Sequence, residues 1–144
     1  MQDGLVVQLG GDGDLTWQVM VAGDTENLLT MLQVHREGVR VANSGFGGPP
    51  LYPGTLVNEW RGRTDDLPYF VMVRTAPAVV SVVAVTERGI KVAVPLSDVV
   101  AVYGLRFGAA ALPPGEVPAW LRATTADGDL PELGTAPGVP PWSR

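Results

Sequence analysis

Glycine and proline interrupt this chain so often that little room is left for long helices. They supply 18 and 13 of its 144 residues and separate short apolar runs along the whole length. Proline removes a backbone donor, and glycine raises the entropic cost of a regular element. The apolar runs contain 22 valines against one isoleucine, and β-branched side chains favour strands. We therefore predict an all-β fold, a two-layer antiparallel β-sandwich of about 8–10 strands.

Alternation of apolar and polar side chains, together with short apolar runs, predicts where the strands lie in the sequence. From Leu15 to Ala22 the residues alternate between two faces, with Trp17 on the apolar face and Gln18 on the other. The run Val79–Val85 carries apolar residues on both faces, so we expect a central strand there. Further strands are expected at Leu5–Leu9, Thr55–Trp60, Tyr69–Arg74, Val99–Ala110 and Trp120–Thr125.

The segment 79–96 is the clearest hairpin in the chain. Two valine-rich runs flank Glu87-Arg88-Gly89, and Gly89 suits the left-handed position of a three-residue loop. Pro95 has no backbone donor, so it should end the second strand or lie at a sheet edge.

Residues 25–37 fit two interpretations. One is a short helix with a cap at Asp24 or Thr25, and the other is a strand over Leu28–Arg36 that turns back at Glu37-Gly38. We favour the hairpin, because the run Val39–Ala42 alternates and needs a neighbouring strand to pair with.

Length and composition predict one folded unit with a short tail. A chain of 144 residues forms one domain on length alone, and we place it at residues 1–130. Residues 131–144 (PELGTAPGVPPWSR) are rich in proline and glycine and have too few apolar side chains to fold independently. The segment Asn43–Gly54 has a similar composition, and we expect it to be an irregular loop.

The charge pattern disfavours two classes of partner. Net charge is −5, the calculated pI is about 4.7, and Lys91 is the only lysine. Nucleic-acid binding requires clustered cations, so we expect no nucleic-acid partner. No apolar run is long enough for a signal peptide or a membrane span, so we expect no membrane insertion and a cytoplasmic location, with an extracytoplasmic mature chain as the alternative. The excess of valine, alanine, glycine, proline and arginine over lysine and isoleucine is typical of GC-rich bacterial genomes.

Catalysis receives little support from the sequence. The chain has no cysteine and a single histidine, His35, and none of its serines stands in a GxSxG motif. An enzyme normally needs several titratable groups that converge, so we expect a non-enzymatic protein without a bound cofactor.

Four aspartates stand in glycine-containing turns. The segments Gly10–Asp14 and Asp127–Asp129 place Asp12, Asp14, Asp127 and Asp129 beside glycines. Oxygen ligands of this kind suit calcium, but the calcium-binding nonapeptide motif works by stacking several repeats. Ordinary Asp-Gly turns are therefore the favoured interpretation, and a calcium site is the weaker alternative.

The most probable binding feature is the glycine-rich loop with the strand after it. Phe46 and Tyr52 lie in this loop, and Trp60, Arg61 and Arg63 follow it. They could stack on a sugar or insert into a partner, although loop aromatics more often fold back over the core. Trp142 in the tail is a further candidate anchor, since the surrounding PGVPPW can adopt polyproline II.

Low charge content leads to the functional hypothesis. Charged residues make up 17% of the chain, against about 25% in ordinary soluble domains. Part of the surface should therefore be apolar, and contiguous apolar surface usually marks an interface. We expect a non-catalytic interaction or accessory subunit that self-associates or binds a protein partner. The alternative is a small-ligand or carbohydrate-binding sandwich that uses the aromatic loop.

Overall fold

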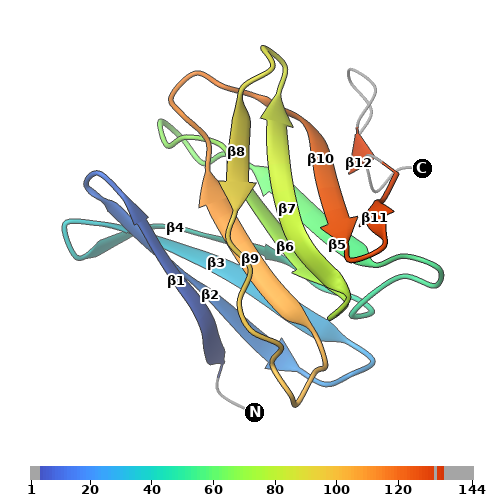
Figure 1. The fold of residues 1–144 in the computed structure, drawn as a ribbon. Coiled ribbons are helices and arrows are strands. Elements are labelled where there is room, and N and C mark those ends of the chain that lie inside the picture. Colours follow the sequence, from blue (N-terminus) through green and yellow to red (C-terminus); the bar gives the residue numbers. More distant parts are fainter. Residues whose placement is uncertain (1–3, 132, 135–144) are drawn as a thin grey trace.

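Every regular element among the described residues, 4–131 and 133–134, is a β-strand. The computed structural model contains twelve strands in this part of the chain, arranged in three antiparallel sheets (Figure 1). The all-β, sandwich-like fold predicted from the sequence is confirmed, with three sheets where two were expected. No helix in these residues is long and apolar enough to cross a membrane.

Sheet A is a simple meander at one side of the molecule. Its order is β1-β2-β3-β4, with bounds Leu5–Asp12, Leu15–Gly23, Leu28–Arg36 and Val39–Phe46. Glu37 and Gly38 join β3 to β4 with φ values of 53° and 81°, which is the two-residue turn that matches the twist of a hairpin. The hairpin is thus confirmed and the alternative helix at 25–37 is wrong. The loop expected from Asn43 begins only after Phe46, because β3 continues to offer partners up to that residue.

Sheet B lies in the middle of the molecule and contains three strands. Its order is β5-β6-β9, with bounds Val57–Gly62, Phe70–Thr75 and Arg106–Ala111. The strand expected over Val99–Ala110 is wrong in its first half. There the amides of Val100 and Gly104 bond to Leu105 and Val100, and Gly104 adopts a left-handed φ of 66°. Glycine at this position permits a tight turn where the valines alone suggested a strand.

Sheet C contains the remaining strands. They are β7 (Val79–Thr86), β8 (Lys91–Val94), β10 (Pro118–Thr125), β11 (Gly128–Asp129) and β12 (Leu133–Gly134). The main path is β11-β10-β7-β8, and β12 also pairs with β10. β7 is therefore a central strand, as predicted. β12 falls within the segment predicted as a tail, and residues 135–144 lie outside the described residues.

The predicted hairpin over 79–96 is confirmed in detail. Gly89 has a φ of 87°, and its amide donates to the carbonyl of Thr86. The Thr86 hydroxyl accepts a bond from the amide of Ile90, at 3.0 Å. β8 ends at Val94, directly before Pro95, because proline cannot donate to the ladder.

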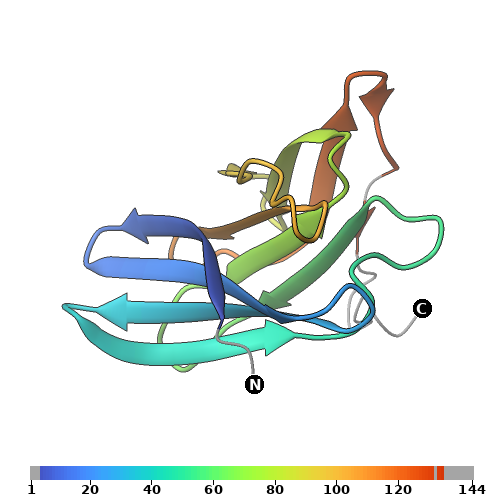
Figure 2. The same cartoon turned by 90° about the horizontal axis from the view of Figure 1, so that it is seen from below.

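Two apolar clusters separate the three layers. One lies between sheets A and B and includes Trp17, Leu32, Phe70 and Phe107. The other lies between sheets B and C and includes Val71, Val82, Ala110 and Leu121. All six residues of β6 are buried, because alternate side chains enter the two clusters. Figure 2 shows sheet A at the lower left and the strands of sheet C at the upper right, with sheet B between them.

Sheets B and C share an edge. Leu96 follows β8 and forms an antiparallel bridge with Gly108 of β9, and the amide of Ser97 donates to the carbonyl of Phe107 at 2.7 Å. A side chain at position 108 would overlap the carbonyl oxygen of Pro95, so only glycine permits this close crossing. Sheet A has no backbone bridge of this kind in the described chain.

Candidate functional site

The glycine- and proline-rich loop between β4 and β5 is fixed to the core. Asn58 is buried, and its side-chain amide donates to the carbonyls of Pro49 and Pro50, at 3.2 and 3.0 Å. The amide of Leu28 donates to the carbonyl of Gly48, and the amide of Gly48 donates to Asn27 Oδ1. These bonds satisfy the backbone of a segment that has no regular structure of its own.

A buried arginine is the centre of this attachment. Arg74 on β6 is only 1% exposed. Its guanidinium donates to the carbonyl of Leu28 and the hydroxyl of Thr30, both at 2.9 Å, and to the carbonyls of Pro49 and Pro50, at 2.7 and 2.9 Å. No carboxylate among the described residues pairs with it. Desolvation lowers the pKa of Arg74 to about 10, which still leaves it charged at neutral pH.

The aromatic candidates from the sequence do not converge on one site. Phe46 packs inward, and its ring centroid lies 4.4 Å from the guanidinium carbon of Arg74. Trp60 also packs against the cluster between sheets A and B. Tyr52 alone is largely exposed, at 54%. Trp142 lies outside the described residues. Phe46 and Trp60 therefore contribute to the core.

The two arginine candidates are engaged elsewhere. Arg61 forms an ion pair with Glu59, and both side chains are more than nine-tenths buried. Its guanidinium also donates to the carbonyl of Ala119 at 3.0 Å, which links β5 to β10. The guanidinium carbon of Arg63 lies 5.2 Å from the ring centroid of Tyr69. Arg61 thus links two strands, Arg63 lies against a ring within the β5–β6 connection, and the two do not face the loop as a pair.

The four aspartates occupy turns at separate places in the fold. Asp12 and Asp14 flank the β1–β2 turn in sheet A, and Asp14 pairs with Arg36 at 3.2 Å. Asp127 and Asp129 flank the turn into β11 in sheet C, where the Thr125 hydroxyl accepts a bond from the amide of Asp127. Within the described ranges no three acidic or histidine side chains are grouped to hold a metal. The calcium site stays a prediction.

His35 lies on β3, on the solvent side of sheet A. Its register partners are Thr16 on β2 and Arg40 on β4. Thr16 carries a hydroxyl, but neither register partner supplies the carboxylate that would orient His35 in a catalytic triad. The imidazole is half-buried and belongs to a row of cross-strand neighbours.

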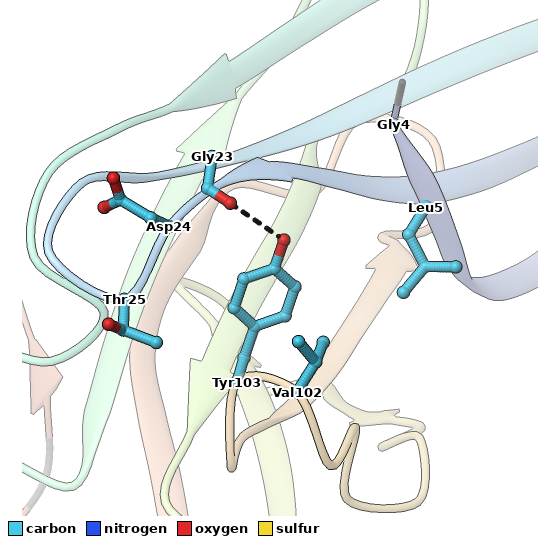
Figure 3. A pocket seen from close by; sticks show the side chains of 7 residues that line it. All are labelled: Gly4, Leu5, Gly23, Asp24, Thr25, Val102 and Tyr103. Atoms are coloured by element: carbon cyan, nitrogen blue, oxygen red, sulfur yellow. Dashed lines mark hydrogen bonds between the residues drawn. The ribbon is translucent and has the colours of Figure 1, made fainter. Parts of the chain in front are cut away.

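One hollow of about 430 Å³ opens beside the β2–β3 turn (Figure 3). The Tyr103 hydroxyl donates to the carbonyl of Gly23 at 3.1 Å, and the exposed side chains of Leu5 and Val102 lie at its sides. Asp24 also lines it, but its Oδ1 accepts the amides of Glu26 and Asn27, both at 2.9 Å. These two bonds lower the pKa of Asp24. The carboxylate therefore stabilises the turn, and little else polar converges on the hollow.

The outer face of sheet A is a surface that carries no carboxylate. We use this name for the outward residues 16, 18, 20 and 22 of β2 and 29, 31, 33 and 35 of β3, with their β1 and β4 neighbours, which are Val6, Leu9, Arg40 and Asn43. Its only ionisable side chains are His35 and Arg40, both near one end. Val6, Leu9 and Leu29 are 43%, 73% and 41% exposed.

The centre of this face is already ordered by its own side chains. Gln18 donates to Gln33 across the strands at 2.7 Å, and Met20 stands opposite Met31. Cross-strand pairs of this kind stabilise a sheet and hold its side chains in place. A surface that is ordered before it binds loses less side-chain entropy on association.

Sheet C presents a different outer surface. A second hollow of the molecule, of about 460 Å³, lies here. It is lined by Ser81 and Val83 of β7, Lys91 of β8, Arg122 and Thr124 of β10, and residues 129–130. The hydroxyls of Ser81 and Thr124 share a short hydrogen bond. Trp120 lies next to Arg122 along the same face of β10 and is 43% exposed. We call this surface the outer face of sheet C.

Comparison of the chain with protein-family models, with curated proteins and with solved structures found no match. A proposal about function therefore rests on the residues of this chain alone.

Sequence reasoning did not single out either outer face as a site. The alternation over Leu15–Ala22 does separate Thr16, Gln18 and Met20 from the apolar face. This alternation indicated the two faces of β2 alone. It could not show that β1, β3 and β4 continue the same outer surface. Lys91 was noticeable as the only lysine. That it shares one face of sheet C with Arg122 depends on the register of β7 with both β8 and β10.

Proposed function

We propose that this protein is a non-catalytic interaction module that associates with a second copy of itself through the outer face of sheet A. The observation that carries the proposal is the absence of carboxylates from this four-stranded face. The chain has 15 acidic residues and a net charge of −5, so an acid-free surface of this extent is unusual for it. Interface centres are depleted in charge and enriched in methionine, as this face is.

The area of the face suits a stable interface. Strands of eight or nine residues extend for about 27 Å, and four strands at 4.8 Å spacing are about 19 Å wide. The projected area is then about 500 Å², and the accessible area is larger because side chains stand out from the sheet. Specific interfaces bury roughly 600–1,000 Å² on each partner. Packing of one complete sheet face against another reaches the lower part of that range.

Charge supports a second copy as the occupant. Two chains of charge −5 repel each other, and contact through a face without carboxylates keeps the acidic groups apart. A twofold axis that lies in the plane of the interface and perpendicular to the strands places His35 and Arg40 of one copy over the Ala22 and Leu29 end of the other. The cationic ends then do not oppose one another.

The oligomeric state tests this proposal. Sedimentation equilibrium of the full chain should show a monomer–dimer equilibrium, and Leu9→Lys should weaken dimerisation by at least about tenfold, because two new like charges would face a closed interface. Leu9 is 73% exposed, so the substitution should leave the monomer folded. Val80→Lys is the matched control, since Val80 is exposed to a similar degree on sheet C.

Two results would contradict the proposal. One is a wild-type chain that stays monomeric at high concentration. The other is a dimer that Leu9→Lys leaves intact while Val80→Lys dissociates it, because the interface would then lie on sheet C.

A further inference from the structure

The register of sheet C brings side chains of complementary chemistry into three adjacent rows. In the first row Lys91 and Trp120 flank Val85, and in the second Arg122 stands beside Val83. Directly opposed residues share one face of an antiparallel sheet, so these side chains all point outward. The hollow of about 460 Å³ is lined by Lys91 of the first row, by Val83 and Arg122 of the second and by the third row, whereas Trp120 does not line it.

The third row supplies hydrogen-bonding groups. Thr124 stands opposite Ser81 on one side and Asp129 on the other. The two hydroxyls both donate and accept hydrogen bonds, and the carboxylate accepts them. Among the described residues, Asp129 is the only acidic side chain that lines the hollow.

Lys91 is the clearest sign that the hollow is built for a ligand. Its side chain is exposed, and within the described ranges its ammonium group makes no hydrogen bond or ion pair, although the chain has an excess of acidic residues. The only lysine of the chain is thus held on the same face as Arg122, with Val83 and Ala93 making the surface between them apolar. Such a pair attracts a negatively charged group.

The combination specifies the chemical class of the ligand. Two cations favour an anion, paired hydroxyls and one carboxylate suit a ligand with many hydroxyl groups, and an exposed indole offers a flat apolar surface. A plain anion would not use Trp120, and a neutral sugar would not need Lys91. A nucleic acid is disfavoured because it needs an extended cluster of cations, and two cationic side chains line this hollow.

We propose that the outer face of sheet C binds an acidic saccharide. Lys91 and Arg122 contact its carboxylate, Trp120 stacks against a sugar ring, and Ser81, Thr124 and Asp129 exchange hydrogen bonds with its hydroxyls. This site is separate from the outer face of sheet A and does not depend on self-association.

Calorimetric titration of the full chain with an alginate tetrasaccharide tests the proposal. The wild type should bind it, whereas maltotetraose, which has no carboxylate, should bind at least tenfold more weakly. Lys91→Gln should weaken alginate binding about tenfold, and Trp120→Ser should weaken it by a similar factor. Arg40→Gln is the matched control, because it removes a cation from the outer face of sheet A and should leave binding unchanged.

Three outcomes would overturn the proposal. They are the absence of alginate binding at millimolar concentration, equal affinity of Lys91→Gln and wild type, and complete displacement of the tetrasaccharide by an equal concentration of inorganic phosphate. The last result would indicate a plain anion site. Because Lys91 is exposed and without a partner in the described chain, its replacement should not unfold the protein, and a circular-dichroism melt checks this for each variant.

Discussion

The two outer sheets of this molecule are attached to the middle sheet in different ways. The chain crosses between sheets B and C three times, from β6 to β7, from β8 to β9 and from β9 to β10, and a backbone bridge at Leu96 and Gly108 joins them. The chain passes between sheets A and B once, through the loop after β4. Sheet A therefore relies on side chains for its attachment.

Two polar side chains add hydrogen bonds to the apolar cluster that packs sheet A against sheet B. Arg74 reaches from β6 to the carbonyl of Leu28 and the hydroxyl of Thr30 in β3. Gln8 of β1 accepts the amide of Ala109 at 3.0 Å and donates to the carbonyl of Pro95 at 2.8 Å. A layer attached by few polar side chains should depend strongly on each of them, whereas a layer attached by backbone crossings should tolerate their loss.

The largest expected effect is that of Arg74→Met. The substitution removes the buried guanidinium bonds to the carbonyls of Leu28, Pro49 and Pro50, and Asn58 still donates to the two proline carbonyls. The free energy of unfolding should fall by about 3 kcal/mol. Amide exchange should show the greatest loss of protection in β3 and in residues 47–50. Since the pKa of Arg74 is about 10 and burial disfavours its charged form, the difference from wild type should stay constant from about pH 5 to pH 8.

Arg106→Met is the control for this comparison. Arg106 lies opposite Thr75 on β9 and donates to the carbonyls of Pro77 and Ser97, at 3.2 and 3.3 Å, but it is only partly buried. Its loss should cost less than about 1 kcal/mol. Equal destabilisation by the two substitutions would show that sheet A does not depend on Arg74 in particular.

Replacement of two glycines, one at the shared edge of sheets B and C and one within sheet A, should lower the free energy of unfolding by intermediate amounts. Gly108→Ala would force a methyl group against the carbonyl oxygen of Pro95, which the backbone bridge holds in place, so we expect about 2–3 kcal/mol of destabilisation in urea unfolding. Gly10→Ala would press on the indole of Trp17 within sheet A, and a side chain yields more easily, so about 1–2 kcal/mol is expected.

Gly11→Ala controls for the general effect of replacing a strand glycine. Its added methyl group would come no closer than 3.4 Å to the Leu15 carbonyl oxygen, so stability should hardly change. A larger loss for Gly10→Ala than for Gly108→Ala would reverse the expected order and indicate that the shared edge of sheets B and C is the more adaptable region.

The smallest expected effect is a difference in salt dependence between binding at the outer face of sheet A and binding at the outer face of sheet C. Raising the ionic strength from about 0.1 M to about 1 M shortens the Debye length from about 10 to about 3 Å. The dimer dissociation constant should change less than about twofold, because the outer face of sheet A is almost uncharged, whereas alginate binding on sheet C should weaken about tenfold. Equal salt dependence, measured by sedimentation and calorimetry in the same buffers, would show that the two faces do not differ in this way.

Local sequence patterns carried most of the strand assignment, and they failed where a turn depended on one residue. The alternation over Leu15–Ala22 and the loop at Gly89 were both predicted correctly. The valine-rich start of Val99–Ala110 resembled a strand, yet Gly104 turns the chain there. Nearest-neighbour propensity cannot weigh a single left-handed glycine against several β-branched residues.

The candidate sites were less accessible to sequence reasoning. Phe46 and Trp60 were named as candidate binding residues, with packing over the core as the favoured alternative for Phe46, and the structure packs both against the core. Arg74 was treated as the last residue of a strand, since nothing local shows that its guanidinium is buried among carbonyls.

Short antiparallel strands could be predicted from local residue chemistry, because glycine, proline and valine act on the backbone within a few residues. The arrangement of these strands in three layers, with β6 buried on both sides, emerged from the folded structure. The folded structure also decided that Lys91, Arg122 and Trp120 share one face. Layering and register depend on contacts between residues far apart in the chain, and their free energies are settled only when the sheets pack together.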